Sequence, residues 1–339
     1  MSTTSFQETS KSFAKILELH CLSGFKHVKK TLFSYVLFHA LFVVFFFLQI
    51  TISSLLYLFS KTPTVLAFSL FFFIFSAFTY LVLIFYFQTK KQDRLKLLKE
   101  WFLSICKQSV GEGLNVMDYH LYLAGALYSF SNMFHLKDLP VYFSSVPILS
   151  WQRLMRKCSY LWHWKDFQTM RKLLILDCIY QHLALLKYEP TNLEVHGSLA
   201  NTYLTLASIY QMSYHQDTSR FSSDDLSAKT LKAFNHAVYK AIEEYKIILS
   251  SAPNDPWVLA QLAACYHELH LYAEEIYYFE KILEITSPNL DILYRLAYLY
   301  FQEGHSAEGF KLYKHIRDLD EAKADALFEY YLSKAQESF

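Results

Sequence analysis

PWVLAQLAACYHELHLYAEEIYYFEKILEITSPN, residues 256–289, repeats its apolar pattern in the residues that follow it. Seven positions have a counterpart 34 residues later: Leu259 with Leu293, Leu262 with Leu296, Ala263 with Ala297, Tyr266 with Tyr300, Phe279 with Tyr313, Ile282 with Ile316 and Ile285 with Leu319. A fixed period of this length is typical of stacked helical hairpins. Each hairpin leaves an apolar face that only a neighbouring hairpin covers, so we expect an α-solenoid whose concave surface can bind a partner.

Two long uncharged stretches precede the repeats. Neither 31–60 nor 62–89 contains Asp, Glu, Lys or Arg, and each exceeds the ~20 residues that a helix needs to cross a bilayer core of about 30 Å. Lipid offers no partner to backbone amides, so we expect two transmembrane helices, at about 32–59 and 64–87, in a tight hairpin. A cleaved signal peptide would have a shorter and earlier apolar run. Two buried helices of a soluble core would rarely remain uncharged for so long.

Basic residues flank this hairpin on one side. Lys26, Lys29 and Lys30 come before it, and Lys90, Lys91, Arg94, Lys96 and Lys99 come after it, whereas the turn carries only Lys61. Basic flanks remain cytoplasmic. The charge pattern therefore predicts a multi-pass membrane protein whose N- and C-termini are both cytoplasmic.

The polar side chains inside the first span are few. His39 and Gln49 could mark a transport path, but a single His or Gln can also pair across a hairpin, and hydroxyls can bond back to their own helix. A transporter would bring more spans and recurring ionisable residues, so we interpret residues 31–89 as an anchor. Residues 1–30 are expected to form a polar and amphipathic N-terminal segment, and residues 90–116 a juxtamembrane helix and linker.

The repeats resemble the tetratricopeptide repeat (TPR) family. One unit, 256–289, carries Leu259, Leu262, Ala263, Tyr266, Phe279 and Ile282, and the next, 290–321, carries Leu293, Leu296, Ala297, Tyr300, Gly304, Tyr313 and Ile316. The sequence departs from the family pattern at four places: Glu275 and Gly309 stand where a small residue is usual, Pro288 is displaced by one position, and Glu321 replaces the last proline. The resemblance implies an all-α, TPR-like domain over 117–339, closed by a capping helix at 322–335.

Upstream of residue 256 the period weakens. Leu199, Ala200 and Tyr203 indicate another first helix, and residues 166–186 another second helix, with the polar run 214–227 expected as an inserted loop. Leu121 and Tyr128 suggest a degenerate unit that Pro140 and Pro147 interrupt. The number of repeats before residue 190 stays open.

Members of the family usually hold ligands on the groove formed by their first helices. Mapped onto this sequence, the resemblance implies a partner-binding row of Asn201, Trp257, His267, Tyr294, Arg295, Tyr298 and Phe301. Tyr and Arg recur at interface hot spots because they supply contact area and hydrogen bonds with few rotors. Alternatively, Tyr294, Tyr298 and Phe301 pack within the superhelix against the capping helix.

One branch of the family grips C-terminal carboxylates with Lys, Asn and Arg side chains. Asn201 and Arg295 match that set, but Gly197 and Asp291 occupy the lysine positions. Without the lysines two carboxylates would lack a paired charge, and Asp291 would repel them. This ligand is therefore not expected here.

The sequence contains few signs of a catalytic or metal-binding site, so we predict neither an enzyme nor a bound metal or cofactor. His267 and His270 lie on one helix face without a third ligand at metal spacing, and there is no HExxH motif or phosphate-binding glycine loop. The five cysteines are spread out and form no CxxC pair, which favours reduced thiols. A net charge of +1 argues against a general nucleic-acid binder.

Three functional interpretations remain. The first is a scaffold in a bacterial inner membrane that binds a protein or peptide partner through its solenoid groove. In the second, the hairpin resembles the bilobed hydrophobic domain of chlamydial inclusion membrane proteins, and the polar start 1–10 is compatible with export to a host-facing membrane. The third is a membrane enzyme or transporter with an accessory TPR domain.

Overall fold

The computed structural model describes residues 3–60, 62–109, 115–134, 149–218 and 224–337. Within these ranges the chain is all-helical, as predicted, with eleven helices and no strand. It divides into two compact units, Met1–Gln181 and His182–Phe339, and the division falls within one helix, α4 (Leu149–Leu186). Pro140 and Pro147, which we expected to interrupt a degenerate repeat, lie outside the described residues.

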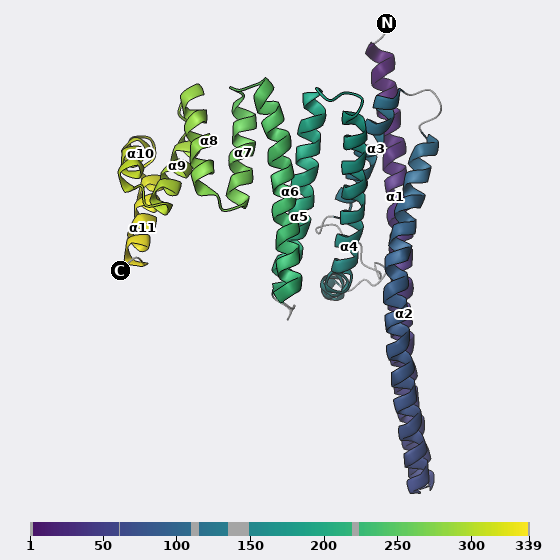
Figure 1. The fold of residues 1–339 in the computed structure, drawn as a ribbon. Helices are drawn as coiled ribbons and strands as arrows, with labels where there is room; N and C mark the ends of the chain where they lie inside the picture. Colours follow the sequence, from purple (N-terminus) through teal and green to yellow (C-terminus); the bar gives the residue numbers. More distant parts are fainter. Residues whose placement is uncertain (1–2, 61, 110–114, 135–148, 219–223, 338–339) are drawn as a thin grey trace. The chain divides into compact units, whose positions relative to one another are not determined.

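The first unit contains a long antiparallel hairpin of α1 (Thr3–Ser60) and α2 (Pro63–Ser109), which run side by side in Figure 1. Both helices are longer than the expected spans, because the flanking segments at 3–30 and 90–109 continue the same helices. Seven hydroxyls in the uncharged stretches donate to the carbonyl three or four residues earlier: Ser34, Thr51, Ser54, Ser69, Ser76, Thr79 and Thr89. His39 Nδ1 lies 3.0 Å from the Tyr80 hydroxyl on the opposite helix.

Among the described residues, the base of this hairpin is the part that packs against other helices. There α3 (Val116–Asn132) and α4 cover α1 and α2, in a core that includes Leu32, Phe102 and Phe130. The Phe102 and Phe130 rings stack with their centroids 4.2 Å apart. Lys91 and Lys99 of α2 form ion pairs of 2.5 and 2.7 Å with Asp166 and Asp177 of α4. The end of the hairpin that contains the uncharged stretches is left exposed.

The second unit is a TPR-like α-solenoid, shown in green to yellow in Figure 1. Three hairpins follow one another, and each pairs two antiparallel helices that contact each other. They are α5 (Leu193–Thr218) with α6 (Asp224–Ser251), α7 (Pro256–Glu268) with α8 (Tyr272–Ile285), and α9 (Leu290–Gln302) with α10 (Ser306–Leu319). The last helix, α11 (Glu321–Glu337), contacts both α9 and α10 and so closes the stack.

Local signals explain where the first helices of the two clear repeats begin. Asp255 Oδ1 accepts a hydrogen bond of 2.9 Å from the Trp257 amide, and Pro256 occupies the first turn of α7. Asn289 Oδ1 accepts a matching bond of 2.9 Å from the Asp291 amide at the start of α9. Both are helix N-caps, which satisfy backbone amides that have no partner inside the helix.

The inserted loop predicted at 214–227 was wrong. Helix α5 continues to Thr218 and α6 already begins at Asp224, so most of this polar run is helical. The α5/α6 hairpin is therefore longer than the two hairpins that follow it. Its extra turns extend the first helix of the hairpin beyond Tyr210.

Gly309, one of the departures from the family pattern, has a packing reason. A Cβ atom at this position would lie 2.5 Å from Cε1 of Phe301. The Phe301 ring occupies the space that a small side chain of α10 usually fills, since it packs against Phe310 and Tyr331 with centroid distances of 5.1 and 4.9 Å. The glycine is thus the partner of a large aromatic residue in the preceding helix.

Candidate functional site

The seven residues of the predicted partner-binding row all lie on the first helices of the hairpins. Asn201 is on α5, Trp257 and His267 are on α7, and Tyr294, Arg295, Tyr298 and Phe301 are on α9. The structure gives them different surroundings. Those on α5 and α7 are accessible, whereas those on α9 are largely engaged by neighbouring side chains.

The aromatic residues of α9 pack inside the solenoid. Phe301 is only 3% exposed, so the expectation that it contacts a partner does not fit its position in the core. Tyr298 stacks on Tyr330 of α11 with ring centroids 4.1 Å apart, and Tyr294 packs against the same core cluster. Their position matches the alternative in which these rings pack against the capping helix.

Asn201 and Trp257 lie on either side of a buried tyrosine of α6. The Tyr245 hydroxyl donates a 2.9 Å hydrogen bond to Asn201 Oδ1, and burial, with a smaller contribution from Cys265, raises the pKa of Tyr245. The Trp257 ring lies edge-on to the Tyr245 ring at 6.0 Å and is 49% exposed. Tyr245 therefore fixes Asn201 while Trp257 remains free to offer apolar surface.

Arg295 and His267 converge on Glu275, the second departure from the family pattern. Arg295 donates from Nε and Nη2 to Glu275 Oε1 at 3.0 and 2.9 Å. His267 Nδ1 lies 3.0 Å from Glu275 Oε2 and 2.6 Å from Arg295 Nη2. Side-chain exposure is 2% for Glu275, 32% for Arg295 and 44% for His267. A glutamate is tolerated at this usually small position because a forked guanidinium from the next repeat neutralises it.

A pocket of about 240 Å³ lies beside this cluster, where α5, α6 and α7 meet. Its lining combines polar and apolar side chains: Gln211, Tyr214, Leu231, Phe234, His267, Glu268 and His270. Gln211 Nε2 donates to Glu268 Oε2 at 3.1 Å, which links the first helices of two successive hairpins. The pocket therefore belongs to the accessible part of the predicted groove.

Sequence reasoning missed most of this pocket. Tyr214 fell in the expected loop, and Gln211 was not assigned to the partner-binding row although it precedes that loop. A signal was present, because Asn201 is followed by Thr205, Ser208 and Gln211 at helical spacing.

His270 has an unusual backbone. It is the only residue other than glycine with a positive φ in the described part of the chain, at 57°. The equivalent position of the next repeat, 34 residues later, is Gly304 with φ of 82°. A left-handed conformation costs an L-residue about 1–2 kcal/mol. The His270 Nδ1 atom lies 3.0 Å from the Tyr272 hydroxyl.

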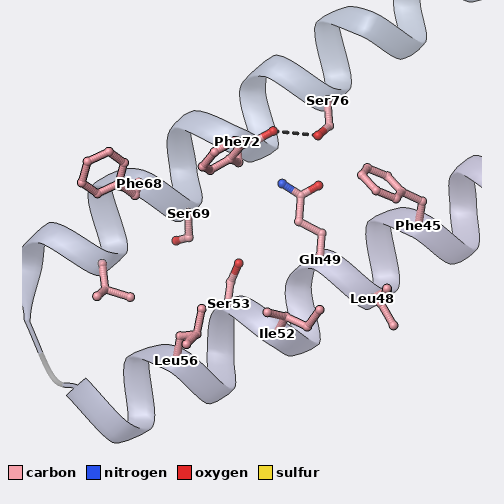
Figure 2. A pocket seen from close by; sticks show the side chains of 11 residues that line it. Phe45, Leu48, Gln49, Ile52, Ser53, Leu56, Phe68, Ser69, Phe72 and Ser76 are labelled. Carbon is pink, nitrogen blue, oxygen red and sulfur yellow. Dashed lines mark hydrogen bonds between the residues drawn. The ribbon is translucent and has the colours of Figure 1, made fainter.

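A second hollow, of about 430 Å³, lies between the two helices of the hairpin in the first unit. Figure 2 shows the Gln49 side chain pointing from α1 toward α2, where Ser69 and Ser76 lie. The Gln49 Oε1 atom is buried and has no hydrogen-bond partner among the described residues. The rest of the lining is mainly Phe and Leu, so this hollow offers hydrogen bonding but no ionised group.

The described residues offer little to a metal or to nucleophilic catalysis. Among them there is no group of three or more His, Cys, Asp or Glu side chains placed to hold a metal ion. Burial raises the pKa of Cys21, Cys106 and Cys265 to about 12 in each case, with smaller contributions from Glu18, Cys21 and Glu268 respectively. These thiols are therefore protonated, and a thiol reacts as a nucleophile only when it is ionised.

Comparison with known proteins finds likeness in structure only. No protein-family model and no curated protein matches the chain. Among solved structures, a crystal structure of MamA is 14% identical, with a TM-score of 0.31, and the match covers 49% of this chain and 92% of that one. MamA from Desulfovibrio magneticus is 10% identical, with a TM-score of 0.25, and the match covers 48% and 96%.

A tetratricopeptide repeat protein from Parabacteroides merdae is 12% identical, with a TM-score of 0.26, and that match covers 72% of this chain and 96% of the other. Likeness at this level carries no inference about function. Function has to be argued from the chain's own surfaces.

Proposed function

We propose that the protein is a membrane-anchored scaffold, held in the bilayer by α1 and α2, whose second unit binds a protein or peptide partner. The accessible groove on α5 and α7 is the binding surface. The proposal rests on the contrast between two exposed surfaces. The hairpin of the first unit exposes apolar side chains, whereas the groove of the second unit exposes both polar and aromatic side chains.

The exposure of the hairpin supports an anchor. Both helices are long and apolar enough to cross a membrane, and their most apolar stretches are only 0% and 6% buried. Phe47, Leu58, Phe59, Phe68 and Phe78 are each more than 60% exposed. A core helix of a soluble protein would be mostly buried, and a monomeric soluble protein rarely exposes an apolar surface of this extent.

The groove supports a binding role. Trp257 and Ala264 are exposed on α7, and Glu268, which lines the pocket, follows Ala264 by about one helical turn. Aromatic residues with a polar rim are the usual composition of a protein interface. We therefore narrow the partner-binding row to Asn201, Trp257 and His267, and extend it to Gln211, Glu268 and His270. Arg295, Tyr294, Tyr298 and Phe301 support this surface from within the solenoid.

The basic flanks favour a topology in which both chain ends and the solenoid face the cytoplasm. The turn at Thr62 then lies on the opposite side of the membrane. Single cysteines at Thr62 and at Ser333, in a chain whose own cysteines are replaced by serine, should react with a membrane-impermeant maleimide from opposite faces. Labelling of both positions from one face would contradict a two-span anchor.

Crosslinking and pull-down of the full chain from native membranes tests the binding role. Ala264→Arg places a long side chain on the exposed face of α7, and Ala326→Arg places the same side chain on the exposed face of α11. The proposal predicts one partner that is captured by the wild type and by Ala326→Arg but lost with Ala264→Arg. Equal capture by both variants would show that the partner binds elsewhere.

A further inference from the structure

We infer that the pocket between α5, α6 and α7 receives one basic side chain of the bound partner, an arginine in preference to a lysine. This inference rests on the proposed function and specifies the ligand chemistry of the same groove. The pocket holds about 240 Å³, below the ~300–1,000 Å³ of sites that enclose drug-sized molecules. Its size suits a single side chain.

Charge selects a cation. Glu268 is the only carboxylate among the described residues that line the pocket, and none of them is Lys or Arg. Gln211 binds the Oε2 atom of Glu268, which leaves Oε1 to accept from a guanidinium. Arg295, whose Nη2 lies 2.6 Å from Nδ1 of His267 in the pocket wall, is already paired with Glu275 at 2.9 Å. An incoming cation therefore meets a net negative site.

The walls favour a planar cation. Phe234 and Tyr214 contribute aromatic rings, and His267 and His270 contribute imidazoles. A guanidinium stacks on such rings and is more weakly hydrated than an ammonium, so it is easier to desolvate. Lysine would gain the ionic contact with Glu268 but less of the stacking.

His270 places an imidazole in the wall of the pocket. Its positive φ is that of a left-handed residue at a helix C-terminus, where the Leu271 amide donates a 3.0 Å hydrogen bond to the Tyr266 carbonyl, and Gly304 holds the same place in the next repeat.

A random peptide library displayed on phage, selected against the full chain in lipid nanodiscs, tests the inference. Three proteins are compared: wild type, Glu268→Gln, and the control Glu303→Gln, which removes an equal charge from an exposed glutamate outside the pocket. We expect peptides with one invariant basic residue, Arg more often than Lys, on the wild type and the control, and an Arg→Lys exchange in the best peptide should weaken its binding. Their affinity should fall about tenfold on Glu268→Gln, as expected for loss of one partly exposed ionic contact.

Charge reversal separates recognition from a structural role of Glu268. When the invariant Arg of the best peptide is replaced by Glu, the changed peptide should no longer bind the wild type. It should bind the Glu268→Lys variant, in which the charge of the pocket is also reversed. Peptides without a basic residue that still lose binding with Ala264→Arg would overturn the inference and leave the proposed function standing. Failure to select any peptide on the wild type would overturn both.

Discussion

Removing Arg295 should destabilise the solenoid far more than removing its partner Glu275. In Arg295→Ala the Glu275 carboxylate remains, with 2% of its side chain exposed, and among the described residues His267 is left as its side-chain hydrogen-bond partner. Leaving one charge of a buried pair without its partner costs about 3–5 kcal/mol. Because His267 is 44% exposed and admits water to the cluster, we expect about 3 kcal/mol, toward the lower end.

Glu275→Ala should cost only about 1 kcal/mol, because the arginine left behind is 32% exposed and can turn to solvent. The alanine also restores the small side chain that is usual at this position in the family. The double variant leaves no unpaired charge buried, so its free energy of unfolding should fall by about 1–2 kcal/mol, well below the ~4 kcal/mol sum of the two single variants.

The assay is hydrogen–deuterium exchange of the full chain, followed in peptides from α7, α8 and α9, since local opening energies report directly on this cluster. Peptides from α1 and α2 provide an internal control and should not change. Equal losses for the two single variants, adding in the double variant, would refute the view that a buried carboxylate depends on Arg295.

Three further predictions concern stability. Gly309→Ala should lower the free energy of unfolding in urea by about 1–2 kcal/mol, because overpacking against Phe301 outweighs the gain in helix propensity. In a Phe301→Leu background the same change should be neutral or stabilising. A loss of stability in both backgrounds would exclude the clash with Phe301 as the cause. His270→Gly should raise the free energy of unfolding by about 0.5–1 kcal/mol, because glycine adopts a positive φ at lower cost, and it should weaken peptide binding. A variant no more stable than the wild type would show that the backbone at His270 is not strained. Burial lowers the pKa of His182 from 6.5 to about 4, so the stability that its neutral form contributes is complete above pH 6.5 and is lost as the pH falls to 4 and below, by about 3 kcal/mol in all. Urea unfolding at pH 7 and at pH 5 should show about 2 kcal/mol of this loss, and His182→Leu should remove that part of the pH dependence.

The sequence predicted the elements that depend on periodicity. The 34-residue repeat from Leu259 to Leu293 placed α7 to α10, because most of its apolar positions, such as Leu262 and Leu296, are buried between helices. The long uncharged runs placed α1 and α2. Where the prediction failed, composition was misleading: the run 214–227 is polar, yet α5 continues to Thr218 and α6 begins at Asp224. Tyr214, at the start of the run, lines the pocket together with Leu231 and Phe234 of α6.

The site was harder to predict than the fold, because its contacts join residues that no period relates. Glu275 and Arg295 lie 20 positions apart and belong to different repeats, so the sequence showed only a misplaced glutamate and a candidate ligand-binding arginine. Phe301 shared the helix face assigned to the groove, yet the ring turns inward toward Gly309. A shift of one position around a helix decides between groove and core, and a single sequence cannot resolve it.

The most direct test of the scaffold is photocrosslinking in intact membranes, with a photoreactive amino acid at Gln211 in one variant and at Leu319 in the other. Gln211 lines the groove pocket, and Leu319 is 62% exposed at the end of α10, outside that pocket. Our account predicts one discrete protein adduct at Gln211, retained in the carbonate-washed membrane fraction, and none at Leu319. Equal adducts at both positions, or a chain released from the membrane by carbonate, would contradict a tethered protein-binding groove.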